Sequence, residues 1–464
     1  MTPRQTFRDL FVDNPIVKKD GLWVLARKKT LWGFAAAAVL VGVTGSLVWL
    51  SEVQKAEQYG STFPVGDGLL SIMLGLAFLI AGVLLPAMAS STLAGEREHG
   101  TLPLLAISGL SPARIVVGKI AAMLVLVGPF VALPLPGVAL GALSIGIDFF
   151  PLLVCLCALV TSTVASAAVG VYVSSMTTRG RVAAPAALAA AVVPAFLCAF
   201  PALALIAEAV EETRMAELEY YHHSQTVELT LFALGGIFLG AVVAAAAAFG
   251  AWSQLAPRTT PRLARATALF MSIIIGSPLV ATVLVLLGSR GGNSSFRLTE
   301  GFFFFSLLVS AAAVLLYSAG IGRDARAPAP WKMVPTAALA AVGAWVLCVQ
   351  LADPARHSID DTGVIAVMHV LAASALASLV AHRVSSALTA AFAGGAAVVI
   401  LLLVPAILDE VLIGRPPLAF LNVAYAKNAD LPVALLFWGS LTVGALVLAS
   451  RSRRTAAITR FDHR

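Results

Sequence analysis

Charged side chains are scarce in this chain of 464 residues: Asp, Glu, Lys and Arg make up 12% of it, and hydrophobic residues make up 59%. Together with a mean hydropathy of +0.92, this composition excludes an ordinary soluble domain. Cysteine is also rare. Cys155, Cys157, Cys198 and Cys348 all fall in apolar runs and lack the spacing of disulfide or metal frameworks, so we expect them to pack as small apolar side chains.

A phosphate-binding loop of the form Gly-x-x-x-x-Gly-Lys-Ser/Thr is missing. The pair Gly118-Lys119 is followed by Ile120, and no glycine stands at the required upstream position. We therefore expect that this chain is not an enzyme and has no cofactor of its own. The acidic segment 208–228 is interpreted as a solvated helix rather than a metal site, because its adjacent histidines would point about 100° apart on a helix.

Long apolar runs fill most of the chain. A helix that crosses a membrane needs about 20 mostly apolar residues, and we find about twelve such runs. They cover residues 31–50, 69–94, 115–145, 150–174, 182–207, 229–251, 267–287, 302–321, 333–351, 362–380, 387–408 and 431–450. The sequence therefore predicts an all-α polytopic membrane protein.

The basic residues indicate how these spans are oriented. Short cytoplasmic loops are rich in Lys and Arg, so a topology with both termini in the cytoplasm should place most of these residues on the inner side. Seven of the 31 basic residues then fall in outer segments, and the other 24 lie inside. The seven are Lys55, Arg214, Arg290, Arg297, Arg356, Arg415 and Lys427. This asymmetry predicts cytoplasmic N- and C-termini in a plasma membrane, and it explains the net charge of +7 without nucleic-acid binding.

Residues 1–30 precede the first span and mix basic with apolar side chains, starting from Asn14-Pro15. Two interpretations are open at this point. The segment is either a simple basic flank of the first span or an amphipathic elbow helix that lies flat against anionic membrane lipids. Its position before the polar loop described next favours the elbow.

A dense polar segment separates the second and third apolar runs. It comprises Glu96, Arg97, Glu98, His99, Gly100, Thr101, Leu102, Pro103, Leu104 and Leu105, and Ser111, Pro112, Gly118 and Lys119 follow it. Acidic residues are unexpected in an inner loop, where basic residues are the rule. We therefore interpret Glu96 and Glu98 as groups that face a basic partner surface.

Local signals in this segment predict two capped helices joined by a turn. Thr101 is in position to cap a short apolar helix, and Pro103 is tolerated in the first turn of that helix. Gly109 would end the helix. Ser111 then serves as the N-cap of the third span, with Pro112 at its first helical position.

This pattern resembles the cytoplasmic coupling element of the ABC-2 family of ABC transporter permeases. The family pattern runs acid, any residue, Gly-Thr-Leu, a leucine pair, a Pro/Ser turn and Gly-Lys. It matches Glu98, Gly100, Thr101, Leu102, Leu104, Leu105, Ser111, Gly118 and Lys119. Pro103 stands where an acid is common, and Gly109-Leu110 replaces the usual turn. The resemblance covers roughly residues 14 to 255.

The resemblance implies a permease subunit, usually of an exporter, that is driven by ATP hydrolysed in a separate cytoplasmic ATPase dimer. Loop 96–107 would contact this ATPase, and replacing Glu98 would weaken the coupling. Two other functions stay open: a secondary transporter driven by an ion gradient, and a membrane scaffold that docks an ATPase without moving a substrate. Few acids lie at membrane depth, which argues against the ion-driven transporter.

The resemblance implies that residues 31–255 form a six-helix core of ABC-2 type, and residues 256–464 are expected to add six further spans with a basic tail. An internal duplication would repeat the coupling motif between the eighth and ninth spans, but residues 322–328 carry no such motif. Two coupling loops for an ATPase dimer would then require a second permease chain. The sequence predicts a homodimer, or a heterodimer with a related permease, in the inner membrane of a bacterium.

Glycine and proline in the third and sixth spans predict features of packing. Pro129, Pro134 and Pro136 must interrupt the backbone hydrogen bonds of the third span. The pairs 137/141 and 236/240 have the small-residue spacing of closely packed membrane helices.

Overall fold

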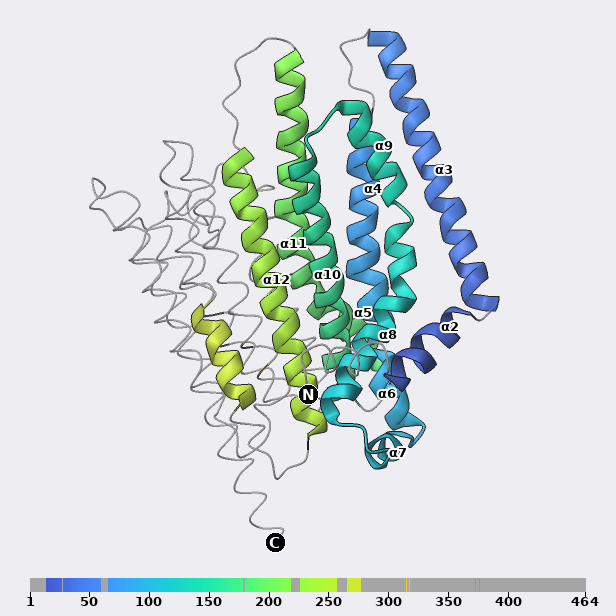
Figure 1. The fold of residues 1–464 in the computed structure, drawn as a ribbon, viewed down its shortest axis with the longest axis vertical. Helices are drawn as coiled ribbons and strands as arrows, with labels where there is room; N and C mark the ends of the chain where they lie inside the picture. Colours follow the sequence, from blue (N-terminus) through green and yellow to red (C-terminus); the bar gives the residue numbers. More distant parts are fainter. Residues whose placement is uncertain are drawn as a thin grey trace, which may run out of the picture. The chain divides into compact units, whose positions relative to one another are not determined.

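The computed structural model describes residues 14–26, 28–59, 66–177, 180–217, 226–256 and 265–276, together with Val314, Tyr317, Ala372 and Ala375. The chain divides into two compact units, Met1–Leu255 and Ala256–Arg464. The described residues are almost entirely helical, in agreement with the predicted all-α class (Figure 1).

Five described helical stretches are long and apolar enough to cross a membrane. They are Thr30–Gln58, Asp67–Glu98, Pro112–Ala132, Phe149–Met176 and Leu229–Leu255. Each coincides with a predicted span. The predicted span 182–207 lies within a longer helix that contains three prolines, and the predicted spans beyond residue 276 lie outside the described residues.

The first unit begins with a short elbow and continues through a helical bundle. Its elements are η2 (Val17–Leu22), α2 (Trp23–Leu25), α3 (Lys28–Tyr59), α4 (Asp67–Leu79), η3 (Ile80–Leu84), α5 (Leu85–Ala89), α6 (Ser91–Glu98), α7 (Leu102–Ile107), α8 (Pro112–Ala132), α9 (Leu135–Ile145), α10 (Phe149–Met176), α11 (Gly180–Glu217) and α12 (Thr226–Leu255). The apolar core forms between α4, α8, α10 and α11, around residues such as Leu70, Leu74, Val127 and Ala158.

The second apolar stretch crosses the unit in four pieces, α4, η3, α5 and α6. Pro86 has no backbone N–H, and its ring cannot pack against the carbonyl four residues earlier, so the regular helix yields to the wider π-helical turns of η3 just before it. A second interruption falls at Ser90, after which α6 starts as a separate segment. The predicted single span 69–94 is therefore one apolar stretch with two joints.

The third stretch also divides, as its prolines predicted. Helix α8 ends at Ala132, and α9 begins after Pro134 and ends at Gly146, which has a positive φ of 79°. The glycines of α9 let it approach α4 closely, because a Cβ at Gly137 would lie 2.7 Å from Cγ of Met73 and one at Gly141 would lie 2.8 Å from the Leu70 nitrogen. The close packing predicted for this pair is confirmed.

Helix α3 lies at the edge of the first unit (Figure 1), and most of its apolar side chains are exposed; Trp32, for example, is 76% exposed. Besides apolar packing by residues such as Val41, two specific contacts hold it. The ring of Phe34 meets that of Phe130 edge to face, with centroids 5.5 Å apart. Near the other end of α3, the buried Glu52 carboxylate accepts hydrogen bonds from the backbone N–H groups of Gly66, at 2.9 Å, and Gly68.

Replacing Glu52 by alanine is expected to detach α3 from the start of α4. Two backbone donors lose their acceptor in a buried place, which costs about 1–3 kcal/mol of the free energy of unfolding. Denaturant unfolding of the full chain in mixed micelles measures this loss. The exposed Glu57→Ala on the same helix is the control, and an equal effect of both variants would contradict the role given to Glu52.

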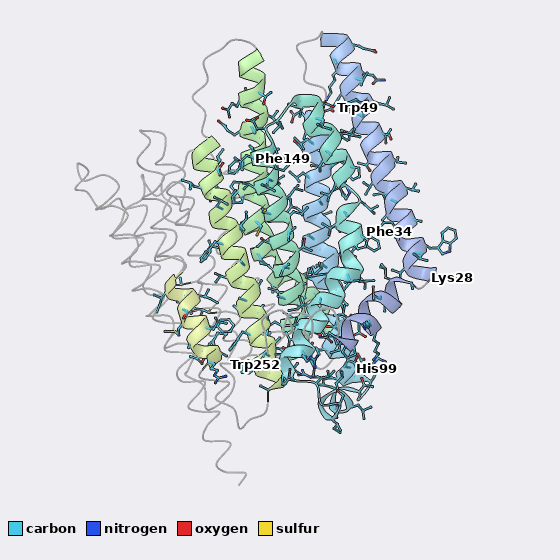
Figure 2. All side chains as sticks on the ribbon, viewed as in Figure 1. Lys28, Phe34, Trp49, His99, Phe149 and Trp252 are labelled. Atoms are coloured by element: carbon cyan, nitrogen blue, oxygen red, sulfur yellow. The ribbon has the colours of Figure 1, made fainter. Side chains whose placement is uncertain are left out.

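Polar elements gather at one end of the first unit. Figure 2 shows His99 towards this end and Trp49 and Phe149 towards the opposite end. The elbow, α6, α7 and the start of α8 meet at the His99 end (Figure 1). We call this the α7 end.

The second unit is described over Arg265–Gly276, an apolar helix too short to qualify as a span by itself. Its Phe270 packs edge to face on Tyr317, with ring centroids 5.8 Å apart. The Tyr317 hydroxyl also lies 3.4 Å from Oγ1 of Thr267. The predicted spans 267–287 and 302–321 thus contact each other through these side chains.

Candidate functional site

The predicted coupling loop forms a tight helix–turn–helix at the α7 end. Gly100, with φ of 69°, closes helix α6: the Gly100 N–H donates to the Arg97 carbonyl at 3.1 Å and the Thr101 N–H to the Glu96 carbonyl at 2.8 Å. These two bonds form a Schellman motif, which needs a left-handed residue at the position of Gly100. Gly109, with φ of 74°, follows the end of α7. The two glycines therefore fix the direction in which α7 leaves the bundle.

Thr101 precedes α7 as predicted, but the prediction that its side chain caps this helix is wrong. Its backbone is helical, with φ of −89° and ψ of −12°, whereas a capping side chain needs an extended backbone. The Thr101 hydroxyl instead donates to the Glu96 carboxylate and, at 3.2 Å, to the Glu96 carbonyl. An ionised carboxylate is the stronger acceptor, so Thr101 braces the turn rather than the helix.

Ser111 caps α8 in the predicted way. Its backbone is extended, with φ of −66° and ψ of 148°, and its hydroxyl oxygen accepts from the Arg114 N–H at 3.3 Å. Pro112 occupies the first turn of α8. The Ser-Pro pair thus starts the third span shortly after the end of α7.

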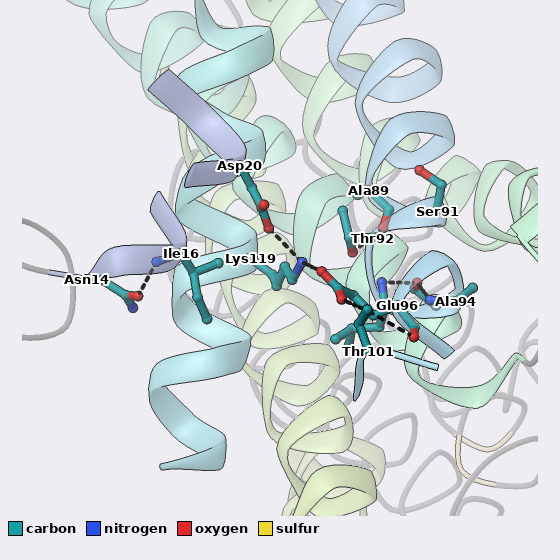
Figure 3. Close-up of polar contacts among 12 residues, drawn as sticks. Asn14, Ile16, Asp20, Ala89, Ser91, Thr92, Ala94, Glu96, Thr101 and Lys119 are labelled. Carbon is teal, nitrogen blue, oxygen red and sulfur yellow. Dashed lines mark hydrogen bonds and ion pairs between the residues drawn. The ribbon is translucent and has the colours of Figure 1, made fainter. Parts of the chain in front are cut away.

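A group of charges around one buried ammonium joins this loop to the elbow. Lys119 of α8 is 3% exposed, and its Nζ lies 2.6 Å from Oδ2 of Asp20 and 3.3 Å from Oε1 of Glu96. Figure 3 shows the ammonium group between the two carboxylates. We call Asp20, Lys119 and Glu96 the charge cluster. Glu96 therefore points inward, towards Lys119, and not away from the chain towards a partner.

The elbow lies along α8 on a second set of contacts. The Asn14 side-chain amide donates to the Arg114 carbonyl at 2.8 Å. The Asn14 side-chain oxygen accepts from the Ile16 N–H at 3.1 Å, as Figure 3 shows. Asn14 is fully buried beside Gly118, where a Cβ would lie 2.6 Å from its Nδ2. Residues 17–25 are thus helical and pack along α8, whereas the position of this segment flat against membrane lipids stays a prediction.

Replacing Gly118 by alanine is therefore expected to displace Asn14 and loosen the elbow. The added methyl group requires the Asn14 amide to move, and that movement breaks its hydrogen bond to α8. Losing the bond costs about 1 kcal/mol, which corresponds to a several-fold faster amide exchange in residues 14–26. Hydrogen–deuterium exchange measures the change, with Gly95→Ala as the control, because no atom lies within 4 Å of a Cβ there. Unchanged exchange in Gly118→Ala would contradict this packing.

Helix α6 is also fastened to α10. The Ser174 hydroxyl oxygen accepts from the N–H groups of Leu93 and Ala94, at 2.8 and 2.9 Å, and so satisfies donors left open where α6 restarts after Ser90. At the other end of α6, the Arg97 guanidinium donates to the Thr177 carbonyl at 3.0 Å. Arg97 thus holds the end of α6 against the end of α10.

The outward side of the loop is apolar. Leu104 is 66% exposed and Ile107 is 80% exposed, whereas Leu102 and Leu105 are half-buried. We call Leu104 and Ile107 the α7 face. Glu98, His99 and Pro103 are exposed beside it. A short apolar helix on a firmly braced support, with an acidic residue at its edge, has the features of a protein-binding site.

Three residues that contact the loop had no role in the prediction from the sequence: Asp20, Ser174 and Thr177. Asp20 is the single acid in a stretch that is otherwise basic and apolar, and that exception is the signal that could have identified it. Ser174 and Thr177 are small polar residues at the end of an apolar run, which carry no comparable signal.

Neither a cofactor pocket nor a metal centre is assigned to this site. Among the described residues, no three or more His, Cys, Asp and Glu side chains are arranged to hold a metal ion. The chain matches no protein-family model, and comparisons with curated proteins and with solved structures give no match either.

Proposed function

We propose that this chain is the membrane-spanning permease subunit of an ATP-binding cassette transporter of the ABC-2 type, and that it works as an exporter. In this proposal the chain has about twelve spans and cytoplasmic termini in a bacterial inner membrane. Separate cytoplasmic ATPase subunits bind and hydrolyse ATP. They contact the permease through loop 96–107, and the permease supplies the path for the substrate.

The observation that carries the proposal is the exposed α7 face on a rigid support. Leu104 and Ile107 project from a helix of six residues whose two turns are set by left-handed glycines. A loop without a partner would gain nothing from such exposed apolar side chains, because they cost solvation free energy in water. The braces from Lys119, Thr177 and Ser174 would let a force on α7 reach α6, α8 and α10.

The distribution of charge supports the orientation in this proposal. Lys18, Lys19, Arg97 and Arg114 all belong to elements at the α7 end, as expected for the cytoplasmic side. The buried acid Glu52 gives little support to an ion-driven transporter. Its carboxylate already accepts hydrogen bonds from two backbone N–H groups, which gives it a structural role in joining α3 to α4.

Co-purification from the native membrane tests the proposal. The full chain, tagged and extracted in mild detergent, is expected to bring down an ABC ATPase with vanadate-sensitive activity. Two copies of the permease, or one copy with a related permease, are expected for each ATPase dimer. The Glu98→Ala variant is expected to weaken this activity, because Glu98 is exposed at the edge of the α7 face. A chain that purifies without any ATPase would refute the proposal.

A transport assay completes the test. Complexes reconstituted in sealed vesicles are expected to export a substrate only when ATP is present on the α7 side. An ATPase that binds and hydrolyses ATP with no movement of any substrate would instead identify the chain as a scaffold.

A further inference from the structure

We infer that the charge cluster transmits movement of the ATPase-bound loop to the elbow, so that Asp20, Lys119 and Glu96 act as positioning residues in the transport cycle. The inference rests on the proposed function. It concerns three side chains from three different elements, η2, α8 and α6, which meet at one buried ammonium group (Figure 3).

Helix α6 is held near its start and carries Glu96 near its end. It is separated from the membrane-embedded α5 by the interruption at Ser90, and its first turn is held by the Ser174 hydroxyl. Its opposite end carries Glu96 and continues through the Gly100 turn into α7. A displacement of α7 therefore pulls on the end of α6 that carries Glu96, which lies beyond the Ser174 contact and next to the Arg97–Thr177 hydrogen bond.

The charge cluster connects α6 to the elbow, because Lys119 contacts both Glu96 and Asp20. Glu96 is bonded to Lys119 at 3.3 Å, and Lys119 is bonded more closely to Asp20 at 2.6 Å. Ion pairs sheltered from water are strong and directional, so Lys119 follows its partners rather than exchanging them for solvent. Asp20 lies on η2, which packs along α8 and leads through α2 into α3. Movement of the loop thereby reaches the start of the first span.

Hydrogen–deuterium exchange on the co-purified complex tests this link. The complex is examined free of nucleotide and trapped with ADP and vanadate. In the wild-type complex, amide exchange in both 96–107 and 14–26 is expected to differ between the two states. In Asp20→Asn, the difference in 96–107 is expected to remain and that in 14–26 to be lost, because asparagine keeps the shape of Asp20 but carries no charge for Lys119.

Three further variants complete the design. Asp20→Glu retains the charge and is expected to restore the response of residues 14–26. Lys18→Gln alters an exposed charge of the same segment and is expected to behave as the wild type does. Glu96→Gln cuts the link from the loop side, leaves the Asp20–Lys119 pair in place, and is expected to give the same loss as Asp20→Asn. A merely structural cluster would change baseline exchange without removing the difference between nucleotide states.

The outcomes separate the two proposals. A wild-type chain that brings down no ATPase refutes the proposed function. An ATPase that binds and hydrolyses ATP, together with a response of residues 14–26 that persists in Asp20→Asn and Glu96→Gln, overturns the charge link alone. The charge link is also overturned if amide exchange in residues 14–26 of the wild type does not differ between the two nucleotide states.

Discussion

Replacing Lys119 by methionine is expected to lower the free energy of unfolding by about 3–5 kcal/mol, the largest stability effect that we expect from a single substitution in this chain. Lys119 is 3% exposed and compensates two carboxylates that are themselves largely sheltered, 21% and 15% exposed for Asp20 and Glu96. Methionine fills a similar volume but removes the ammonium group that compensates both carboxylates. The cost is therefore electrostatic and not a cavity effect. Denaturant unfolding in mixed micelles, followed by circular dichroism, measures it.

A triple variant provides the control for this prediction. Lys119→Met combined with Asp20→Asn and Glu96→Gln removes all three charges together, and most of the lost stability is expected to return, because no unpaired charge stays buried. Lys119→Arg keeps the charge and is expected to stay close to the wild type. If the triple variant is no more stable than Lys119→Met, the loss comes from packing, and the ion pairs are not its cause.

Replacing Leu104 and Ile107 together by aspartate is expected to abolish binding of the ATPase while leaving the chain folded. Both side chains are mostly exposed, so their loss removes little of the chain's own core. In a complex, each buried apolar anchor contributes about 2 kcal/mol or more, and two unpaired carboxylates would add a desolvation cost. The affinity is expected to fall by at least about 1000-fold, which corresponds to about 4 kcal/mol. Co-purification and binding of the isolated ATPase measure the change.

The conservative pair Leu104→Met and Ile107→Val is the matched control. It keeps an apolar surface of similar size, so binding is expected to be retained within about tenfold. Unfolding curves of the two double variants should coincide with that of the wild type. If the aspartate variant still binds the ATPase with wild-type affinity, the α7 face is not the docking surface, and the exposed polar edge at Glu98 becomes the alternative.

Much of the helical layout could be predicted from hydropathy and from the serine and proline residues at helix ends. Apolar run length located the five candidate spans of the first unit. Ser111-Pro112 correctly gave the start of α8, and the prolines of the third stretch gave the break before α9. Hydropathy was less informative about helix ends: α3 runs on to Tyr59, well beyond the predicted end at residue 50. Polar residues such as Glu52 and Lys55 continue a helix without contributing to an apolar run.

Local sequence features predict a helical chain for an apolar environment, the interruption of the third stretch and the loop that is rich in polar groups, because these properties depend on residues close together in the chain. The direction of each side chain in that loop depends instead on the tertiary fold. Glu96 turns inward because Lys119, 23 positions later, is folded against it, and the same ammonium group binds Asp20 of the elbow. Leu104 and Ile107 remain exposed because the braces on α6 and the glycine turns hold α7 away from the bundle. Such pairings depend on how distant segments pack, and local spacing does not encode them.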